Sequence, residues 1–250
     1  MTSSDQTGST ALVTGASRGF GRAIASALHA QGAKVVAVAR NAELLVSLRD
    51  ELGATLTTVV ADVADPSVAA RLLSLHRPRT VVLNAGATPK AAALHEQTWE
   101  NFSTNWQTDV RHVFNFTREA LNCPLDPGSV VVSLSSGAAL RGSPLSGGYA
   151  GAKSAIRFIS SYAAWDGERT GAGIRFFAVL PQLTPATDLG RLYTEAYAAT
   201  EGITVAQYVE RAGGSLGADD VARGIANLVA DDAYDAPAYL VTRSGLAPVE

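Results

Sequence analysis

The chain has 250 residues, of which 47% are hydrophobic and 17% charged, and its formal net charge is -3. This composition is typical of a globular protein with a substantial buried core and excludes a disordered chain. Basic residues are not clustered as nucleic acid or an anionic membrane would require, and no apolar run approaches the roughly 18 residues that span a bilayer.

Along the chain, short apolar runs rich in valine and leucine alternate with helical patterns. We expect strands at residues 11–13, 34–39, 57–61, 81–83, 129–134, 173–179 and 238–242. We expect helices at residues 22–31, 42–52, 66–75, 99–121, 149–169 and 218–230. Strands that are apolar throughout are typical of a sheet covered by helices on both faces. The alternation therefore predicts a single α/β domain over residues 1–250, with a doubly wound parallel sheet of the Rossmann type in three α/β/α layers.

Two segments fall outside this alternation. The polar residues 1–9 predict a flexible arm rather than a secretory signal, so cytoplasm is the expected compartment. Residues 184–217 mix proline, glycine and aromatic residues with weak helical patterning, and such an insertion often carries a substrate loop. The lone Cys123 is expected to be a small packing residue. The four histidines have no metal-ligand spacing, so we expect no metal site.

The first expected strand is followed by a glycine-rich loop, residues 14–21, that opens the first helix. Gly15 permits a tight turn, Gly19 lets the backbone approach a pyrophosphate, and Gly21 lets the helix pack closely on the strand. The helix then offers unpaired N–H groups to phosphate oxygens. This context predicts a dinucleotide site that includes Ser17 and Phe20 of the same loop; the alternative is a tight turn made for packing alone.

The second expected strand ends at Arg40, and a second arginine, Arg18, lies in the glycine loop. A site for NAD would place a carboxylate near the end of this strand, and residues 38–41 contain none. A guanidinium presents a fork of donors that matches a phosphate. The two arginines therefore favour NADP(H), although either alone would pass for an ordinary surface residue.

Tyr149 and Lys153 are four residues apart at the start of a helix, so their side chains share one face. A phenol is a poor base at neutral pH unless a nearby cation stabilises its anion, and Lys153 supplies that charge. In carbonyl reduction the same phenol acts as a general acid. Ser136 follows the strand at residues 129–134, at the edge where such sheets bind ligands, and its hydroxyl can hold a substrate oxygen.

Taken together, these motifs resemble the short-chain dehydrogenases/reductases over residues 10–242. The matching landmarks are Thr14-Gly-x-x-x-Gly-x-Gly21, Asp62-Val63, Asn84-Ala-Gly86, Ser136 and Tyr149-x-x-x-Lys153. The resemblance implies a seven-stranded parallel sheet, a homodimer or homotetramer, and hydride exchange between NAD(P)(H) and an alcohol or carbonyl substrate.

The same resemblance implies individual roles. Asp62 and Val63 would contact adenine, Asn84 with Ala85 and Gly86 would lie beside the cofactor ribose, and Lys153 would hold the nicotinamide ribose while easing the ionisation of Tyr149. Without the family, Asp62 would pass for a strand-end cap and Asn84 for a turn former.

The sequence departs from the family at Asp109, which takes the place of the fourth catalytic residue, usually asparagine, while His112 replaces a usual glycine. We expect activity to survive with an altered pH profile, because a carboxylate near Lys153 favours the ionised lysine. The alternative is a helical aspartate that faces water. A second departure is Gln182 after Pro181, where the family commonly has glycine. Of the nearby threonines, Thr184 and Thr187, we expect Thr184 to bind the nicotinamide end.

Small residues flank Ser136 and Tyr149, and the 184–217 segment adds aromatic residues. This environment predicts a small apolar or aromatic carbonyl or alcohol substrate, unless the segment packs only on its own domain. The aromatic and leucine residues in question are Leu189, Leu192, Tyr193, Tyr197 and Tyr208. The rival function is a catalytically idle NADP-binding homologue that acts as a redox sensor or scaffold.

Overall fold

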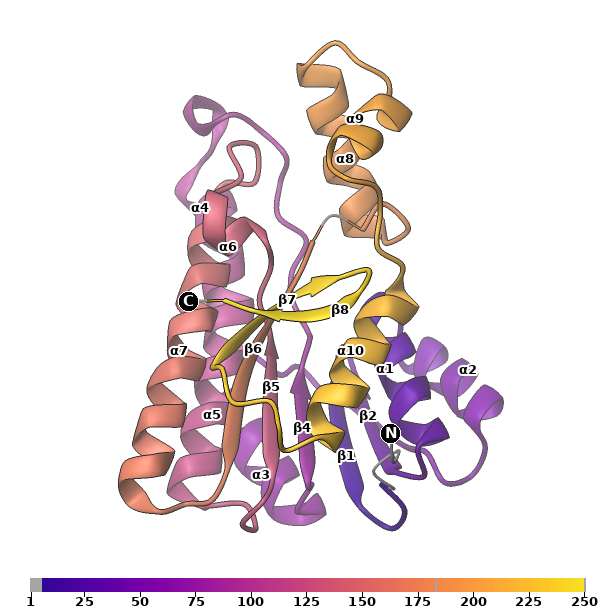
Figure 1. Ribbon diagram of the computed structural model, residues 1–250, viewed down its shortest axis with the longest axis vertical. Helices are drawn as coiled ribbons and strands as arrows, with labels where there is room; N and C mark the ends of the chain where they lie inside the picture. The colour runs from indigo at the N-terminus through magenta and orange to yellow at the C-terminus, as the bar shows by residue number, and fades with distance from the viewer. Residues whose placement is uncertain (1–5, 183, 250) are drawn as a thin grey trace.

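An eight-stranded sheet in the order β3-β2-β1-β4-β5-β6-β7-β8 forms the centre of the computed structural model, which describes residues 6–182 and 184–249 (Figure 1). The strands are β1 (Thr10–Thr14), β2 (Lys34–Ala39), β3 (Thr57–Val60), β4 (Thr80–Leu83), β5 (Val130–Leu134), β6 (Arg175–Pro181), β7 (Ala238–Thr242) and β8 (Gly245–Pro248). Strands β1 to β7 pair in parallel, and β8 pairs antiparallel with β7. The doubly wound α/β fold is confirmed, but the implied seven strands become eight because the chain turns back at Arg243 and Ser244.

Helices cover both faces of this sheet (Figure 1). They are α1 (Gly19–Ala30), α2 (Ala42–Leu52), α3 (Pro66–His76), α4 (Trp99–Asn105), α5 (Arg111–Asn122), α6 (Ala138–Arg141), α7 (Tyr149–Thr170), α8 (Asp188–Thr200), α9 (Val205–Arg211) and α10 (Ala218–Ala230). Helices α1, α2 and α10 lie on one face, and α3, α5 and α7 on the other. Along β1, Val13 packs into the core beneath α1, α2 and α10, and Leu12 packs into the core beneath α3, α5 and α7. Both faces of the strand are therefore buried.

Several expected boundaries are wrong for identifiable reasons. The single helix expected at 99–121 is interrupted by a π-helical turn, Trp106–Val110, which separates α4 from α5. The strand expected at 173–179 runs two residues later, because Gly173 has a φ of +67° that ends the preceding turn. Helix α1 starts at Gly19, three residues early, because the glycine loop supplies its first turn. Residues 1–5 of the expected arm lie outside the described residues, and the N–H of Gln6 donates to the carbonyl of Gln31.

The segment 184–217 contains two helices, α8 and α9, which lie beyond the carboxyl ends of the strands (Figure 1). The Thr187 hydroxyl caps α8 by accepting from the N–H of Gly190. The Thr204 hydroxyl caps α9 by accepting from the N–H of Gln207, and the Gln207 side chain accepts from the N–H of Thr204. These capping residues fix the starts of the two helices, although neither helix has a strong apolar pattern.

The strand order reverses at β1: β2 and β3 lie on one side of it, and β4 begins the series on the other side. A crevice opens at such a reversal, because the following connections lead to opposite faces of the sheet. The glycine loop follows β1, and Asn84 follows β4, so these two motifs meet at the crevice. The fold therefore brings the sequence motifs to one edge of the sheet.

Candidate active site

A pocket of about 1340 Å³ extends along this edge, from the glycine loop to α8 and α9. Of the expected site residues, those that line it are Gly15, Ser17, Arg18, Gly19, Phe20, Arg40, Asp62, Val63, Asn84, Ala85, Gly86, Asp109, Ser136, Tyr149, Lys153, Pro181 and Thr184. Gly21 does not line the pocket. A Cβ atom on Gly21 would meet the carbonyl oxygen of Gly15 and lie 2.6 Å from Nδ2 of Asn84, so this glycine permits the close packing expected of it.

The glycine loop has the geometry of an anion cradle. Gly15 and Gly19 have φ angles of +66° and +55°, which glycine adopts without strain. A Cβ on Gly15 would lie 2.9 Å from the Cα of Ala85, so the turn fits tightly under the end of β4. Arg18 precedes α1, and its side chain makes no capping hydrogen bond to the helix. The first N–H groups of α1 therefore remain suited to a phosphate, and the residues present fit a dinucleotide.

Asn84 ties β4 to the glycine loop. Its Nδ2 donates to the carbonyl oxygens of Thr14 and Gly15, at 3.1 and 3.3 Å. Its backbone N–H donates to the Thr14 hydroxyl at 2.9 Å, and that hydroxyl donates to the carbonyl of Val82. Asn84 thus has a structural task in addition to its place on the pocket wall.

The end of the pocket beyond β2 and β3 contains Asp62 and Arg40, both exposed, and the buried Val63. The Asp62 carboxylate accepts from the backbone N–H of Ala64 at 3.0 Å, which fixes its orientation. Arg18 forms an ion pair with Asp188 of α8 at 2.8 Å. Both arginines line the pocket, and no sequence pattern predicted Asp188 as the partner of Arg18.

Tyr149 is the first residue of α7, and the amine of Lys153 lies 5.5 Å from the centre of its ring. The Ser135 hydroxyl donates to the carbonyl of Lys153 at 2.7 Å and so joins the end of β5 to this first part of α7. The Ser136 hydroxyl oxygen accepts from the N–H of Ala138 at 3.2 Å. A hydroxyl that accepts in this way keeps its own hydrogen for another oxygen. Tyr149, Lys153 and Ser136 thus line one pocket, as expected.

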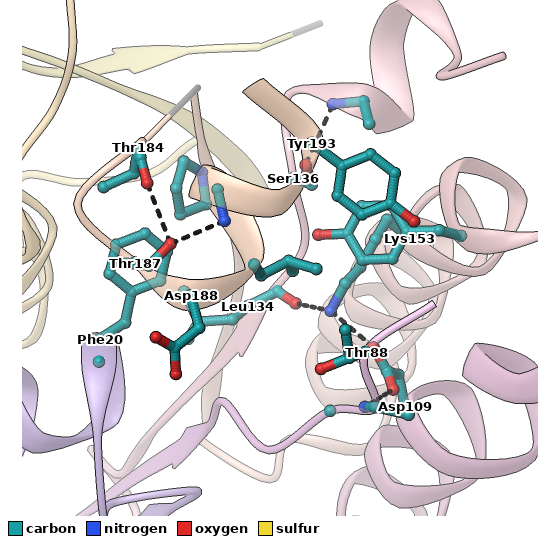
Figure 2. A pocket seen from close by; sticks show the side chains of 18 of the residues that line it. Phe20, Thr88, Asp109, Leu134, Ser136, Lys153, Thr184, Thr187, Asp188 and Tyr193 are labelled. Atoms are coloured by element: carbon teal, nitrogen blue, oxygen red, sulfur yellow. Dashed lines mark hydrogen bonds and ion pairs between the residues drawn. The ribbon is translucent and has the colours of Figure 1, made fainter. Parts of the chain in front are cut away.

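Asp109 lies in the π-helical turn and is 1% exposed, so the alternative of an aspartate facing water is wrong. One carboxylate oxygen lies 3.1 Å from the amine of Lys153, which also donates to the carbonyl of Leu134 at 3.0 Å (Figure 2). The other oxygen accepts from the N–H of Ala87 at 2.8 Å. A Cβ on Gly86 would lie 2.7 Å from the carboxylate, so glycine at this position makes room for it.

The charges at this site follow from burial and pairing. Burial alone would lower the pKa of Lys153, but the Asp109 carboxylate and Tyr149 outweigh it and hold that pKa above its usual range. His112, one turn after Asp109, is fully buried, and burial lowers its pKa to about 3. The histidine is therefore neutral at physiological pH. The fixed charges on this side of the pocket are those of the Asp109–Lys153 ion pair.

Both candidate threonines line the pocket, but their hydroxyls are engaged differently. The buried Thr184 hydroxyl donates to the carbonyl of Gln182 at 2.9 Å. The Thr187 hydroxyl donates to the carbonyl of Thr184 at 3.0 Å while it caps α8 (Figure 2). Residue 183 lies outside the described residues, so the loop is followed only on either side of it.

The far end of the pocket is aromatic. Tyr197 and Tyr208 stack with ring centres 5.9 Å apart, and Tyr193 lies 6.2 Å from Tyr197. Burial raises the pKa of Tyr193, whose neutral hydroxyl donates to the carbonyl of Pro89 at 3.2 Å. Leu189 also lines the pocket, whereas Leu192, also expected there, does not.

Three residues that shape the site were missed by sequence reasoning. Asn105 is fully buried, and its amide donates to the carbonyl of Ala87 and to the Asp109 carboxylate, at 2.8 and 3.3 Å. Asn105 is four residues before Asp109, and this spacing on an expected helix predicts that the two side chains share one face. The carbonyl of Leu134 is a backbone group without any sequence signal. Asp188 pairs with a residue 170 positions away, which no local pattern reveals.

Over the described residues, no group of three or more histidine, cysteine, aspartate or glutamate side chains is placed to hold a metal ion. Within the same ranges, 6–182 and 184–249, none of the helices has both the length and the apolar character needed to cross a membrane.

The chain belongs to the short-chain dehydrogenase/reductase family, since residues 9–198 match the family described as short chain dehydrogenase. It is 30% identical to 3-oxoacyl-(acyl-carrier-protein) reductase from Escherichia coli, over 90% of this chain and 91% of that protein. It is 34% identical to versicolorin reductase 1 from Aspergillus parasiticus, over 60% of each chain. It is 32% identical to NADPH-dependent pterin aldehyde reductase from Arabidopsis thaliana, over 60% of this chain and 66% of that protein. For several curated relatives the match spans about three fifths of the relative's own length.

Proposed function

We propose that the protein is an NADP(H)-dependent oxidoreductase that interconverts a carbonyl group and a secondary alcohol. The observation that carries the proposal is the position of Tyr149 and of the Lys153 amine, 5.5 Å from its ring, in the same pocket as the glycine loop. The relatives whose names describe reductases, one of them NADPH-dependent, agree with this reaction class.

The cofactor's phosphates would lie against the glycine loop, where Gly15, Ser17, Gly19 and Phe20 precede or open α1. Arg18 and Arg40 would bind its 2′-phosphate. The adenine would contact Asp62 and Val63, and the riboses would lie beside Asn84, Ala85, Gly86 and Lys153. The nicotinamide end would lie against Pro181 and Thr184. When bound, NADP(H) supplies or accepts the hydride.

In the direction of reduction, the Tyr149 hydroxyl gives its proton to the carbonyl oxygen of the substrate. The Ser136 hydroxyl donates a hydrogen bond to the same oxygen and orients it. The charge of Lys153 stabilises the phenolate that remains on Tyr149. Asp109 acts through Lys153 and is a positioning residue: it fixes the amine and keeps it charged. In the direction of oxidation the same groups take the proton from the alcohol.

The substrate in this proposal is a small apolar or aromatic carbonyl compound or alcohol. Its reacting oxygen would meet Ser136 and Tyr149, and its body would extend toward the stacked rings of Tyr197 and Tyr208. Aromatic walls favour planar apolar groups, because such groups bury area against a ring without losing hydrogen bonds.

The second candidate is an idle NADP-binding homologue that senses redox state or serves as a scaffold, and Asp109 and Gln182 are the departures that motivate it. Against it, Asp109 is buried and bonded to the lysine that the chemistry needs. The two candidates are separated by following NADPH and NADH oxidation with a panel of aromatic and aliphatic ketones. We expect turnover with NADPH; NADPH binding without turnover of any ketone would favour the idle homologue, and faster turnover with NADH would refute the cofactor assignment.

A further inference from the structure

Three side chains of α8 attach this helix to three different walls of the pocket. The Tyr193 hydroxyl donates to the carbonyl of Pro89, in the loop after β4. The Tyr197 hydroxyl bonds that of Ser143, in the loop before α7. Asp188, in the first turn of α8, pairs with Arg18 of the glycine loop at 2.8 Å. Helix α8 therefore spans the pocket from the glycine loop to the aromatic end.

The Asp188 attachment differs from the other two in strength and exposure. The side chains of Arg18 and Asp188 are 66% and 72% exposed, whereas Tyr193 is buried and Tyr197 is half-buried. Water and salt weaken an ion pair with this exposure, so another anion can displace it at little cost. The Asp188 carboxylate is directed into the pocket, on the side where Phe20 of the glycine loop lies (Figure 2).

The guanidinium of Arg18 is also a proposed ligand of the cofactor. If the cofactor is NADP(H), as proposed above, its 2′-phosphate takes the same guanidinium, and a phosphate carries more charge than a carboxylate. We propose that Asp188 competes with the 2′-phosphate for Arg18, so that arrival of the phosphorylated cofactor releases the first turn of α8 from the glycine loop. Asp188 is then a specificity residue: it opposes binding of the phosphorylated cofactor and leaves the unphosphorylated one unaffected.

The binding test uses Asp188→Asn, which keeps the shape of the side chain and removes its charge. Calorimetric titration at low salt should give an NADPH dissociation constant about two- to five-fold lower than that of the wild type, the range expected for loss of an exposed ion pair. The dissociation constant for NADH should not change, because NADH has no 2′-phosphate. In the Arg18→Gln background, Asp188→Asn should have no further effect on NADPH binding.

The matched control is Glu195→Gln. Glu195 forms an ion pair with Arg191 at 3.4 Å on the same helix and does not line the pocket, so its loss should leave both dissociation constants unchanged. The second measurement needs no cofactor: Arg18→Gln should speed hydrogen–deuterium exchange of the first amides of α8, and Glu195→Gln should not.

The outcomes separate this proposal from the assignment of the cofactor. If the wild type prefers NADPH to NADH but Asp188→Asn binds NADPH equally or more weakly, competition is refuted and Asp188 instead orients Arg18 or has no part in binding. If exchange in α8 is unchanged by Arg18→Gln, the attachment itself is refuted. If the wild type shows no preference for NADPH, the NADP(H) assignment fails and the competition fails with it.

Discussion

Asp109 and Lys153 form an ion pair whose two side chains are 2% and 7% exposed. A buried pair of this kind is poor evidence for stability, because removing two charges from water costs about as much as their attraction returns. Its value here is geometric. Two hydrogens of the ammonium are directed to Asp109 and to the carbonyl of Leu134, which leaves the third for a group in the pocket. The carboxylate thus fixes both the direction and the charge of the lysine.

This pairing predicts a change in pH dependence for Asp109→Asn. The carboxylate helps to hold the pKa of Lys153 above its usual range, so the wild-type lysine stays charged to higher pH. Without it, burial lowers that pKa, and the amine loses its proton at lower pH. The alkaline limb of the profile of kcat/KM against pH should therefore move to lower pH.

The control for this variant is Asp219→Asn, which removes an exposed carboxylate on α10 that is not among the residues lining the active-site pocket. Its profile should match the wild type. Superimposable profiles for Asp109→Asn and the wild type would remove any role of the carboxylate in holding the charge of Lys153.

At the scale of elements, the junction of α1 with β1 and β4 depends on a glycine. A Cβ in Gly21→Ala would press on the backbone of Gly15, which cannot easily move, and would lie 2.6 Å from Nδ2 of the Asn84 side chain. Overpacking of this kind costs roughly 1–3 kcal/mol. We expect the free energy of unfolding, measured with urea, to fall by about 3 kcal/mol and cofactor affinity to fall with it.

Gly167→Ala provides the comparison, because a Cβ there would meet no atom closer than 3.5 Å and alanine favours the interior of α7. It should leave the free energy of unfolding unchanged or slightly higher. Equal stability of the two variants would show that the junction at Gly21 is looser than these distances indicate.

The stacked rings of Tyr197 and Tyr208 join α8 to α9 and line the pocket. Tyr208→Ala should raise KM for aromatic ketones by up to about ten-fold, because loss of an aromatic contact removes roughly 0.5–1.5 kcal/mol. KM for small aliphatic ketones should change little. Steady-state kinetics on matched pairs of ketones checks this, and an equal rise for both classes would point to general disorder of the segment.

The sequence predicts an element well where it carries its own boundary signals. Helix α2 matches its expected bounds because the Asn41 side chain caps it by accepting from the N–H of Leu44, and Gly53 ends it with a φ of +88°. The π-helical turn that contains Asp109 has no such signal, since Trp106–Val110 has no capping side chain and contains neither glycine nor proline. Motifs predicted the residues that line the pocket and the carboxylate near Lys153. They did not predict the contacts of Asn105 and Asp188, which depend on tertiary packing.

One face of the molecule, formed by α5 and α7, has exposed aromatic side chains. Phe158, Tyr162 and Trp165 follow one side of α7 and are 50%, 66% and 65% exposed, and Phe114 on α5 is 48% exposed. Exposed aromatic surface of this kind marks interaction sites in soluble proteins. We therefore expect a homodimer or homotetramer that uses the α5 and α7 face.

The double variant Phe158→Glu with Tyr162→Glu tests this expectation, because two buried carboxylates at such an interface would oppose association. Sedimentation velocity should show the wild type as an oligomer and the variant shifted toward monomer. Leu75→Glu, on the exposed side of α3, is the control and should leave the mass unchanged. A monomeric wild type would contradict the proposed interface.

The architecture gathers the glycine loop, the Asp109–Lys153 pair and α8 around one pocket, and the proposed chemistry of this pocket depends most on Tyr149. The most direct measurement compares the wild type with Tyr149→Phe in NADPH-dependent ketone reduction, with NADPH affinity determined in parallel. We expect kcat to fall by a factor of about 10² to 10⁴, as for loss of a general acid, with NADPH affinity nearly unchanged. A variant that turns over ketones as fast as the wild type would contradict the assignment of Tyr149 as the acid and base.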